Sequence, residues 1–151
     1  MALLWCLISL GIVLAVVVAV RVTSTRLPVP RSILEPVALL LMLGGLALRW
    51  VAILTLGRFF TVDVAIHSDH PVVDVGLYRF VRHPSYSGLM ITFLGLGVFF
   101  GNWLSIIGLL VPTALGVANR VIQEERALLE SLGPAYASYC ARTRRFIPWV
   151  L

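Results

Sequence analysis

Long stretches of apolar residues, separated by short polar segments, dominate the pattern of the chain. Four such runs are present: residues 2–20, 33–56, 86–100 and 103–118. The first two are long enough to cross a hydrocarbon core ~30 Å thick at ~1.5 Å per helical residue, and the last two are shorter. Gly101-Asn102 joins the shorter runs and is typical of a tight turn. The pattern predicts an all-α integral membrane protein with about four transmembrane helices, the last two forming a hairpin.

Polar residues gather in two regions next to that hairpin. One is the loop at residues 57–85, which precedes the third run, and the other is the tail that follows the fourth run. In the tail, residues 123–130 have the pattern of an amphipathic helix that ends at Gly133-Pro134. Because a hairpin returns the chain to the face that it left, both regions are expected on one face. Within one membrane domain we therefore distinguish an N-terminal two-helix segment, residues 1–56, from a functional core, residues 57–151.

Composition supports a membrane location. Of 151 residues, 60% are hydrophobic and 13% are charged, whereas a soluble domain usually carries about a quarter charged residues. The net charge is +5 and all 12 basic residues are arginine, spread beside the apolar runs. That distribution favours contacts with membrane lipid and gives no reason to expect a nucleic-acid partner. Cys6 and Cys140 have neither disulfide nor metal-ligand spacing, so no metal is expected.

The positions of the arginines predict the orientation. With four spans, eight arginines share the side of the loop and tail: Arg58, Arg79, Arg82, Arg120, Arg126, Arg142, Arg144 and Arg145. Three lie on the opposite side: Arg21, Arg26 and Arg31. The positive-inside bias places the loop and tail in the cytoplasm. Because an arginine-only, valine-rich composition is typical of bacterial proteins, we expect a multi-pass protein of a bacterial inner membrane.

Two motifs carry groups that can bind a small charged ligand. The first, Arg82-His83-Pro84-Ser85-Tyr86-Ser87-Gly88, opens the third run, and the second is Glu124-Glu125. A cationic helix start can hold an anion, the glutamates can accept from an amine or a ribose, and Tyr86 offers a ring and a hydroxyl. S-adenosylmethionine has these complements, as do other zwitterionic ligands. Each motif alone also suits a headgroup contact or a solvated helix face, but their shared membrane face favours a binding site.

The same motifs resemble those of the isoprenylcysteine carboxyl methyltransferase family. The matching residues are Leu56-Gly57-Arg58-Phe59-Phe60, Gly76-Leu77-Tyr78-Arg79, the motif at residues 82–88, Glu124-Glu125, Gly133, Tyr136, Tyr139, Arg142 and Pro148. The resemblance extends from about Arg49 to Pro148. The family is similar to phosphatidylethanolamine N-methyltransferases and, more distantly, to membrane sterol reductases. Eukaryotic members are longer, and this chain has a minimal N-terminal half, so we expect a prokaryotic member.

The resemblance implies a cytosolic pocket for S-adenosylmethionine, formed by the last two spans, the preceding loop and the helical tail. The residues implied to bind the cofactor are His83, Tyr86, Gly95, Gly97, Glu124 and Glu125. The two glycines resemble a pair that lets the cofactor approach a helix in the lipid N-methyltransferases, although ordinary helix packing also uses glycine. The residues implied to bind substrate are Arg49, Tyr139 and Arg142.

Among these residues, Arg142 matches the family's arginine for the substrate carboxylate and is the implied catalytic residue. Arg49 lies in the second run, where snorkelling to the interface and a buried charge facing the polar site both stay open. Arg144 and Arg145 are expected to contact anionic headgroups.

The function expected from the resemblance is carboxyl O-methylation of an isoprenylcysteine-like substrate, either a lipophilic small molecule or a lipidated protein. A carboxylate is already nucleophilic at neutral pH, so its methylation needs positioning and desolvation but no general base. Three alternatives stay open: methylation of a phospholipid or lipid amine, a nicotinamide-dependent reductase, and a non-enzymatic module that binds lipid headgroups or a partner. The class of reaction is better supported than the identity of the acceptor.

Overall fold

A computed structural model describes residues 2–57 and 72–146 of the chain. Over these ranges the chain is helical, as the sequence predicts, and it contains no strand. The elements are α1 (Ala2–Arg21), α2 (Arg31–Leu56), the short 3₁₀ helix η2 (Gly76–Arg79), α3 (Pro84–Phe100), α4 (Trp103–Leu132) and α5 (Pro134–Arg142).

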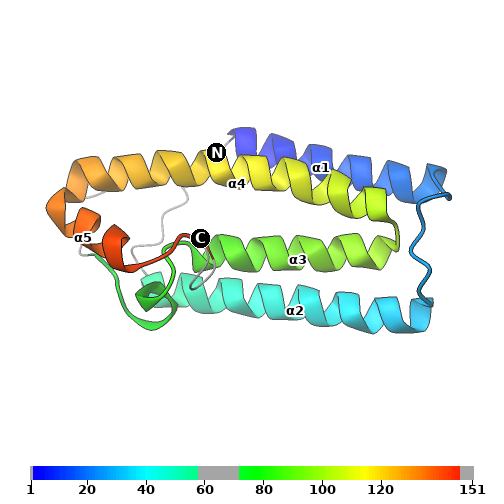
Figure 1. The fold of residues 1–151 in the computed structure, drawn as a ribbon, viewed down its shortest axis with the longest axis horizontal. Coiled ribbons are helices and arrows are strands. Elements are labelled where there is room, and N and C mark those ends of the chain that lie inside the picture. Colours follow the sequence, from blue (N-terminus) through cyan, green and yellow to red (C-terminus); the bar gives the residue numbers. More distant parts are fainter. Residues whose placement is uncertain (1, 58–71, 147–151) are drawn as a thin grey trace.

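The four long helices lie side by side along one axis, with neighbours in the chain running in opposite directions (Figure 1). Helix α3 packs against α2 on one side and α4 on the other, and α1 packs against α4. The α1–α2 connector and the α3–α4 turn therefore meet at one end of the bundle, the connector end. Helix α5, η2, the start of α3 and the end of α4 meet at the other, the tail end.

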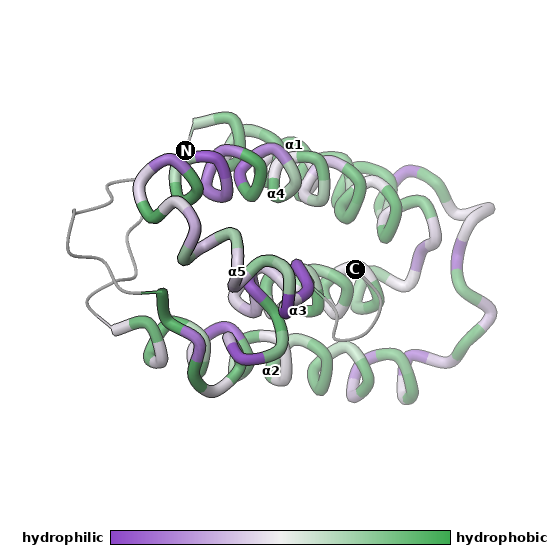
Figure 2. Tube along the Cα trace, turned by 60° about the vertical axis from the view of Figure 1, so that its left-hand side comes forward, coloured by the Kyte–Doolittle hydropathy of each residue, from purple (hydrophilic) through white to green (hydrophobic). Residues whose placement is uncertain are grey.

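Exposed apolar side chains cover much of the surface of α1 and α2. Leu40 and Leu54 on α2 are each 72% exposed, and Val20 on α1 is 68% exposed. Such a surface is unfavourable in water but suits helices whose backbone bonds are satisfied internally within a bilayer. Apolar residues extend along the helices, whereas hydrophilic residues lie around the end of α4 and α5 and, at the opposite end, along the α1–α2 connector (Figure 2). The bundle thus has an apolar body and a polar tail end.

Within the described residues, three helices meet the length and hydropathy expected of a membrane span: α1, α2 and α4. Helix α3 is apolar but has only 17 residues. It packs between α2 and α4, and a short turn joins it to α4. This arrangement agrees with the prediction that the last two apolar runs form a hairpin. The count of four spans itself stays a prediction.

One predicted boundary is wrong. The sequence pattern suggests a fourth run that stops at residue 118 and a separate amphipathic helix at 123–130, but α4 is one continuous helix of 30 residues. The intervening residues contain no helix breaker, and Val117 and Val121 continue one buried stripe that packs with Leu4 of α1. The helix ends at Gly133, whose φ of 53° is readily adopted by glycine. Because α4 is continuous, its charged last turns are held rigidly at the tail end.

Asn102 organises the connector end. Its buried side chain caps α4 by accepting from the backbone N–H groups of Leu104 and Ser105, at 2.9 and 3.3 Å. It also accepts from the Thr25 hydroxyl at 2.9 Å and donates to the Val22 carbonyl at 2.7 Å. One amide therefore caps a helix and fastens the α1–α2 connector to the α3–α4 turn.

Candidate functional site

The two sequence motifs meet at the tail end. Arg82 Nε lies 2.9 Å from Glu125 Oε1, and His83 Nε2 lies 3.3 Å from the same oxygen. The Tyr86 hydroxyl donates to Glu124 Oε1 at 2.8 Å. We call this set the glutamate network; its members are Arg82, His83, Tyr86, Arg120, Glu124, Glu125 and Arg145. Its formation confirms that the α3–α4 hairpin brings both motifs to one face.

Glu125 is the centre of the network. Its side chain is 10% exposed and has cationic or ionisable partners on both oxygens. Arg82 and His83 contact Oε1, while Arg145 contacts Oε2 with Nε at 3.0 Å and Nη2 at 2.8 Å. A carboxylate this buried is stable in its charged form only when it is paired in this way.

Glu124 has different surroundings from its neighbour. Its side chain is 22% exposed, and besides the Tyr86 hydroxyl it accepts from Arg120 Nε at 2.8 Å. Arg120 is one helical turn earlier on α4, a spacing at which opposite charges attract. His83 Nδ1 lies 3.8 Å from Glu124 Oε2, too far for a hydrogen bond. The histidine ring therefore lies between the two carboxylates and is bonded to Glu125.

The first motif is positioned by the local sequence. Pro84 occupies the first turn of α3, where its missing N–H costs no helical bond. His83 precedes it as the N-cap residue, with an extended φ of −126°. This places the motif's histidine at the helix entrance, where it faces the end of α4.

The tail is pinned to the first motif through its backbone. Gly133 turns the chain out of α4 into α5, and the chain then returns beside residues 80–83. The Arg82 N–H donates to the Arg144 carbonyl at 2.7 Å, and the His83 N–H donates to the Arg145 carbonyl at 2.9 Å. This pairing carries the Arg145 side chain to Glu125.

Arg82 joins the tail to the network through its side chain as well. Its Nη1 donates to the carbonyl oxygens of Thr143 at 2.6 Å and Cys140 at 3.1 Å, while its Nε binds Glu125. The hydrogen bonds to the Glu125 carboxylate also raise the pKa of Arg145 above its ordinary value, so Arg145 stays cationic. Two guanidinium groups thus hold one carboxylate in a fixed position.

Tyr139 does not reach the network. It is 3% exposed, and its hydroxyl donates to the Tyr78 carbonyl at 2.7 Å. Burial raises the pKa of Tyr139 to about 12, so the hydroxyl is neutral at physiological pH. The bond fastens α5 to η2, and the predicted contact of this residue with substrate stays a prediction.

Arg142 also lies outside the network. Its side chain is 60% exposed and pairs with Asp74 at 2.7 Å, and its guanidinium is 5.8 Å from the centre of the Tyr139 ring. Its guanidinium is not bonded to either glutamate of the network. Its role with substrate stays a prediction.

Arg49 faces the polar start of α3. Its Nη1 donates to the Ser85 carbonyl at 3.2 Å and to the Ser85 hydroxyl at 3.0 Å. The sequence allows this arginine either to snorkel to the interface or to face the polar site as a buried charge. Its half-buried side chain and its contacts with Ser85 agree with the second interpretation. Its contact with substrate is not tested by this arrangement.

Gly95 and Gly97 pack against neighbouring helices. A Cβ on Gly95 would lie 2.8 Å from the Ala38 carbonyl oxygen and the Met42 nitrogen of α2, and one on Gly97 would lie 3.1 Å from Ile106 of α4. These approaches agree with ordinary helix packing. The structure gives no geometric support to the predicted role of the two glycines in cofactor binding.

The sequence predicts Arg82 as part of a cationic helix start that can hold an anion, but it does not predict the other two arginines of the network, Arg120 and Arg145, as site residues. Arg82 lies inside the first motif, and Arg120 is detectable from its i,i+4 spacing to Glu124. Arg145 was expected to contact anionic headgroups. That expectation is wrong, because its side chain forms an ion pair with Glu125. No local pattern gives that contact, because it depends on the return of the tail. Arg58, Phe59, Phe60 and Pro148 of the resembling motifs lie outside the described residues.

An apolar helical body with a charged network at one end defines a multi-pass membrane protein with an ionic site at the membrane boundary. The profile of the isoprenylcysteine carboxyl methyltransferase family matches residues 37–130. The chain belongs to this family.

Named relatives agree with this assignment. The protein-S-isoprenylcysteine O-methyltransferase B of Arabidopsis thaliana is 37% identical over 108 residues, covering 70% of this chain and 55% of the relative. The Schizosaccharomyces pombe enzyme is 32% identical over 151 residues, covering 98% and 64%. A solved structure of the eukaryotic intramembrane Ras methyltransferase is 26% identical, with a TM-score of 0.75, covering 97% of this chain and 52% of the other.

The chain spans roughly half to two thirds of the length of these relatives. The organisms named for them are eukaryotic, so the predicted bacterial origin receives no support from these matches. The predicted kinship with phosphatidylethanolamine N-methyltransferases is likewise not addressed by them.

Proposed function

We propose that the chain is an integral membrane methyltransferase that uses S-adenosylmethionine to methylate the carboxylate of a lipophilic, isoprenylcysteine-like substrate. The observation that carries the proposal is the glutamate network, in which Arg82 and Glu125, 43 residues apart in sequence, lie 2.9 Å apart. Membership of the methyltransferase family supports the class of reaction. The proposed domain division is that residues 57–151 supply the glutamate network and most of the site, whereas residues 1–56 supply membrane packing and the side chain of Arg49.

The donor and acceptor set of the network suits the proposed cofactor. The Arg145 side chain, which occupies Glu125 Oε2, is 52% exposed, so the ammonium group of a ligand can replace this guanidinium. Glu124 is more exposed than Glu125 and can accept from an amine or a ribose hydroxyl. Beside these two carboxylates, Tyr86 can contact a ligand through its aromatic ring, and His83 can form a hydrogen bond through a ring nitrogen. We therefore assign His83, Tyr86, Glu124 and Glu125 to cofactor binding.

The proposed division of labour follows from the contacts. S-adenosylmethionine, when bound, supplies an electrophilic methyl group on a sulfonium. Arg82 keeps Glu125 ionised and oriented, so the carboxylate needs no reorganisation when a cationic group arrives. Next to Tyr86, the partly buried side chains of Leu89, Met90 and Phe93 pack against the core and exclude water from the adjacent bundle.

Arg142 is proposed to bind the substrate carboxylate. Its only ion pair among the described residues, with Asp74, joins side chains that are 60% and 45% exposed. An ion pair this exposed contributes little stability, so a planar carboxylate can displace Asp74 and form a two-pronged contact with the guanidinium. The Tyr139 ring would support that contact from 5.8 Å below the Arg142 guanidinium, and Arg49, which contacts Ser85 at the start of α3, is proposed to meet the substrate separately.

Two measurements on the detergent-solubilised full chain test the proposal. Calorimetric titration with S-adenosylhomocysteine should give saturable binding, and incubation with labelled S-adenosylmethionine should methylate a prenylated cysteine with a free carboxylate. The matched amide of that substrate should not react. Transfer to a phospholipid amine in place of the carboxylate would contradict the substrate class. Failure to bind the product cofactor would leave the non-enzymatic membrane module as the better account.

The site is proposed to face the cytoplasm. The supporting observation is the surplus of arginines in the sequence on the side of the loop and tail, eight against three on the side of the α1–α2 connector. With Cys6 and Cys140 replaced by serine, single cysteines at Ser24 and Ser131, which are both exposed and lie at opposite ends, can be labelled in intact cells. Only the position at Ser24 should react with an impermeant reagent. Labelling of both positions from one side would contradict the four-span arrangement.

A further inference from the structure

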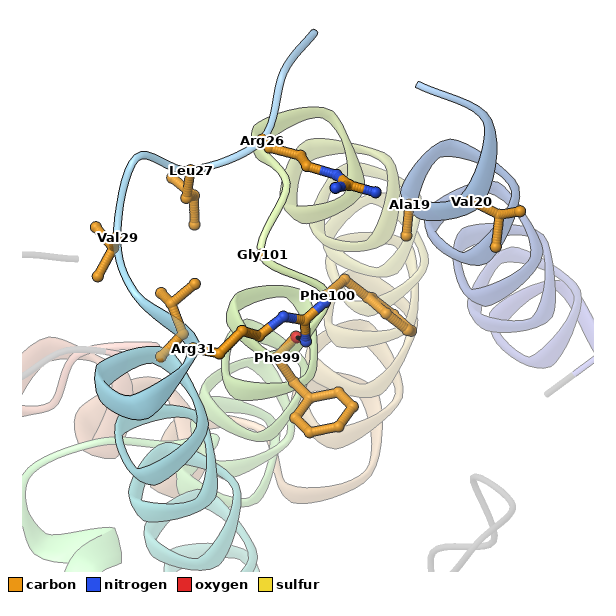
Figure 3. Close-up of a pocket in the computed structure, with 10 residues that line it drawn as sticks. Ala19, Val20, Arg26, Leu27, Val29, Arg31, Phe99, Phe100 and Gly101 are labelled. Atoms are coloured by element: carbon orange, nitrogen blue, oxygen red, sulfur yellow. Dashed lines mark hydrogen bonds between the residues drawn. The ribbon is translucent and has the colours of Figure 1, made fainter. Parts of the chain in front are cut away.

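A recess of about 420 Å³ opens at the connector end, far from the glutamate network. It lies where α1 and α3 end and α2 begins, and it is within the ~300–1,000 Å³ range of ligand pockets. Its lining includes Arg26, Arg31, Leu27, Leu34, Phe99 and Phe100 (Figure 3). The recess thus has two arginines at an otherwise largely apolar surface.

The two arginines come from different segments. Arg26 lies in the α1–α2 connector and Arg31 begins α2, and both side chains extend toward the recess (Figure 3). Arg31 Nη1 donates to the Phe99 carbonyl at 3.1 Å, which holds it beside the aromatic residues. Neither guanidinium has an ion pair to a carboxylate among residues 2–57 and 72–146. Both charges are therefore available to an external anion.

The charge at this end is one-sided. Between residues 21 and 36 the chain has three arginines and one glutamate, Glu35, and the α3–α4 turn adds no charge. The position is also where a bilayer boundary would fall, because all four long helices end or begin here and Val20, which lines the recess, is 68% exposed. A ligand with an anionic head and an apolar tail would satisfy both the guanidinium groups and the apolar lining.

We propose that this recess binds the headgroup of an anionic phospholipid in the leaflet at the connector end. Arg26 and Arg31 contact its phosphodiester, and the first carbons of its acyl chains lie along Phe99, Phe100 and Leu34. A planar guanidinium suits phosphate geometry better than an ammonium group does. The site is independent of the proposed methyl transfer, and it would anchor the connector end at the membrane surface.

Native mass spectrometry of the delipidated full chain, titrated with phosphatidylglycerol or phosphatidylcholine, tests the proposal. We expect phosphatidylglycerol to be retained in preference, and each of Arg26→Gln and Arg31→Gln to weaken its tightest binding step about fivefold, the usual effect of one interfacial cation. Arg21→Gln is the matched control, because Arg21 lies at the same end but does not line the recess. It should change the tightest step little.

Three results would overturn the proposal. The first is equal retention of the two lipids, and the second is an equal loss in Arg21→Gln, which would indicate only a diffuse interfacial charge. The third is binding of soluble glycerol phosphate as tight as that of the lipid, which would show that the apolar lining is unused. Arg31→Gln also removes the bond to Phe99, so thermal unfolding in detergent is measured in parallel. Arg26→Gln keeps the test valid if the other variant unfolds.

Discussion

The two ends of the bundle use arginine in opposite ways. At the tail end, Arg82 is 10% exposed and binds Glu125 and two backbone carbonyls. At the connector end, Arg26 and Arg31 are exposed and have no carboxylate partner among the described residues. The same side chain is thus a fixed internal clamp in one place and an available cation in the other. The difference follows from where acidic residues lie, because the paired glutamates are on α4 at the tail end.

The two ends are also fastened differently. Backbone hydrogen bonds are present at both ends, but buried charge pairs reinforce them at the tail end, whereas a neutral amide, Asn102, does so at the connector end. Breaking a buried charge pair is more costly than removing a neutral hydrogen bond. Breaking the charge pairs at the tail end should therefore affect both stability and cofactor binding, and loss of Asn102 at the connector end should affect stability without changing cofactor binding.

The largest expected effect comes from Glu125→Gln. This variant leaves Arg82 and Arg145 without a counter-charge, and we expect it to lower the free energy of unfolding by about 3 kcal/mol or more. Binding of S-adenosylhomocysteine should weaken by roughly tenfold or more, since a charge-assisted contact is lost. Thermal unfolding and calorimetry in detergent measure the two effects. Glu130→Gln, at an exposed position of the same helix, is the control; equal effects of the two variants would contradict the network's role.

Asn102→Ala sharpens the comparison from the connector end. Loss of the cap and of the bonds to Thr25 and Val22 should lower the free energy of unfolding by about 1–3 kcal/mol. Cofactor affinity, measured by calorimetry below the unfolding temperature, should not change. Asn119→Ala, in the middle of the same helix, serves as the control. A large loss of cofactor affinity in Asn102→Ala would show that the two ends are coupled, against the separation drawn above.

Gly95→Ala tests the body of the bundle between the two ends. The added methyl group would overlap α2, with contacts as short as 2.8 Å, so we expect a loss of about 1–3 kcal/mol of stability. Gly44→Ala on α2 is the matched control, because a Cβ there meets nothing within 4 Å. If Gly95→Ala instead keeps the wild-type melting temperature and loses cofactor binding, the glycine lies against the cofactor as the family resemblance implies.

Arg142→Lys should have the smallest effect on stability, since its ion pair with Asp74 is exposed. Lysine keeps the charge but loses the planar fork, so most transfer to a carboxylate substrate should be lost while cofactor affinity stays close to normal. Single-turnover methylation and calorimetry separate the two. Arg144→Lys should keep both properties. Intact transfer in Arg142→Lys would leave the arginine as a surface charge without a role in catalysis.

Much of the architecture was determined by the sequence itself. Runs of apolar residues this long can be solvated only by lipid or by one another, and their lengths and the Gly101-Asn102 turn place the helices. The hairpin then requires the His83 and Glu125 motifs to share one face, as they do at 3.3 Å. These features are predictable because each depends on local periodicity or on a short connection.

Only the tertiary structure decided which charges pair. Arg144 and Arg145 are adjacent in the sequence and equally basic, yet only the Arg145 side chain binds Glu125, because the returning tail directs it inward. Arg142, the implied catalytic residue, pairs with Asp74, a partner that the sequence motif does not indicate. For Gly95 and Gly97 of α3, the sequence could not show whether the missing side chain makes room for a cofactor or for a neighbouring helix. In each case the deciding contact joins segments far apart in the chain, and its geometry depends on packing that no local pattern records.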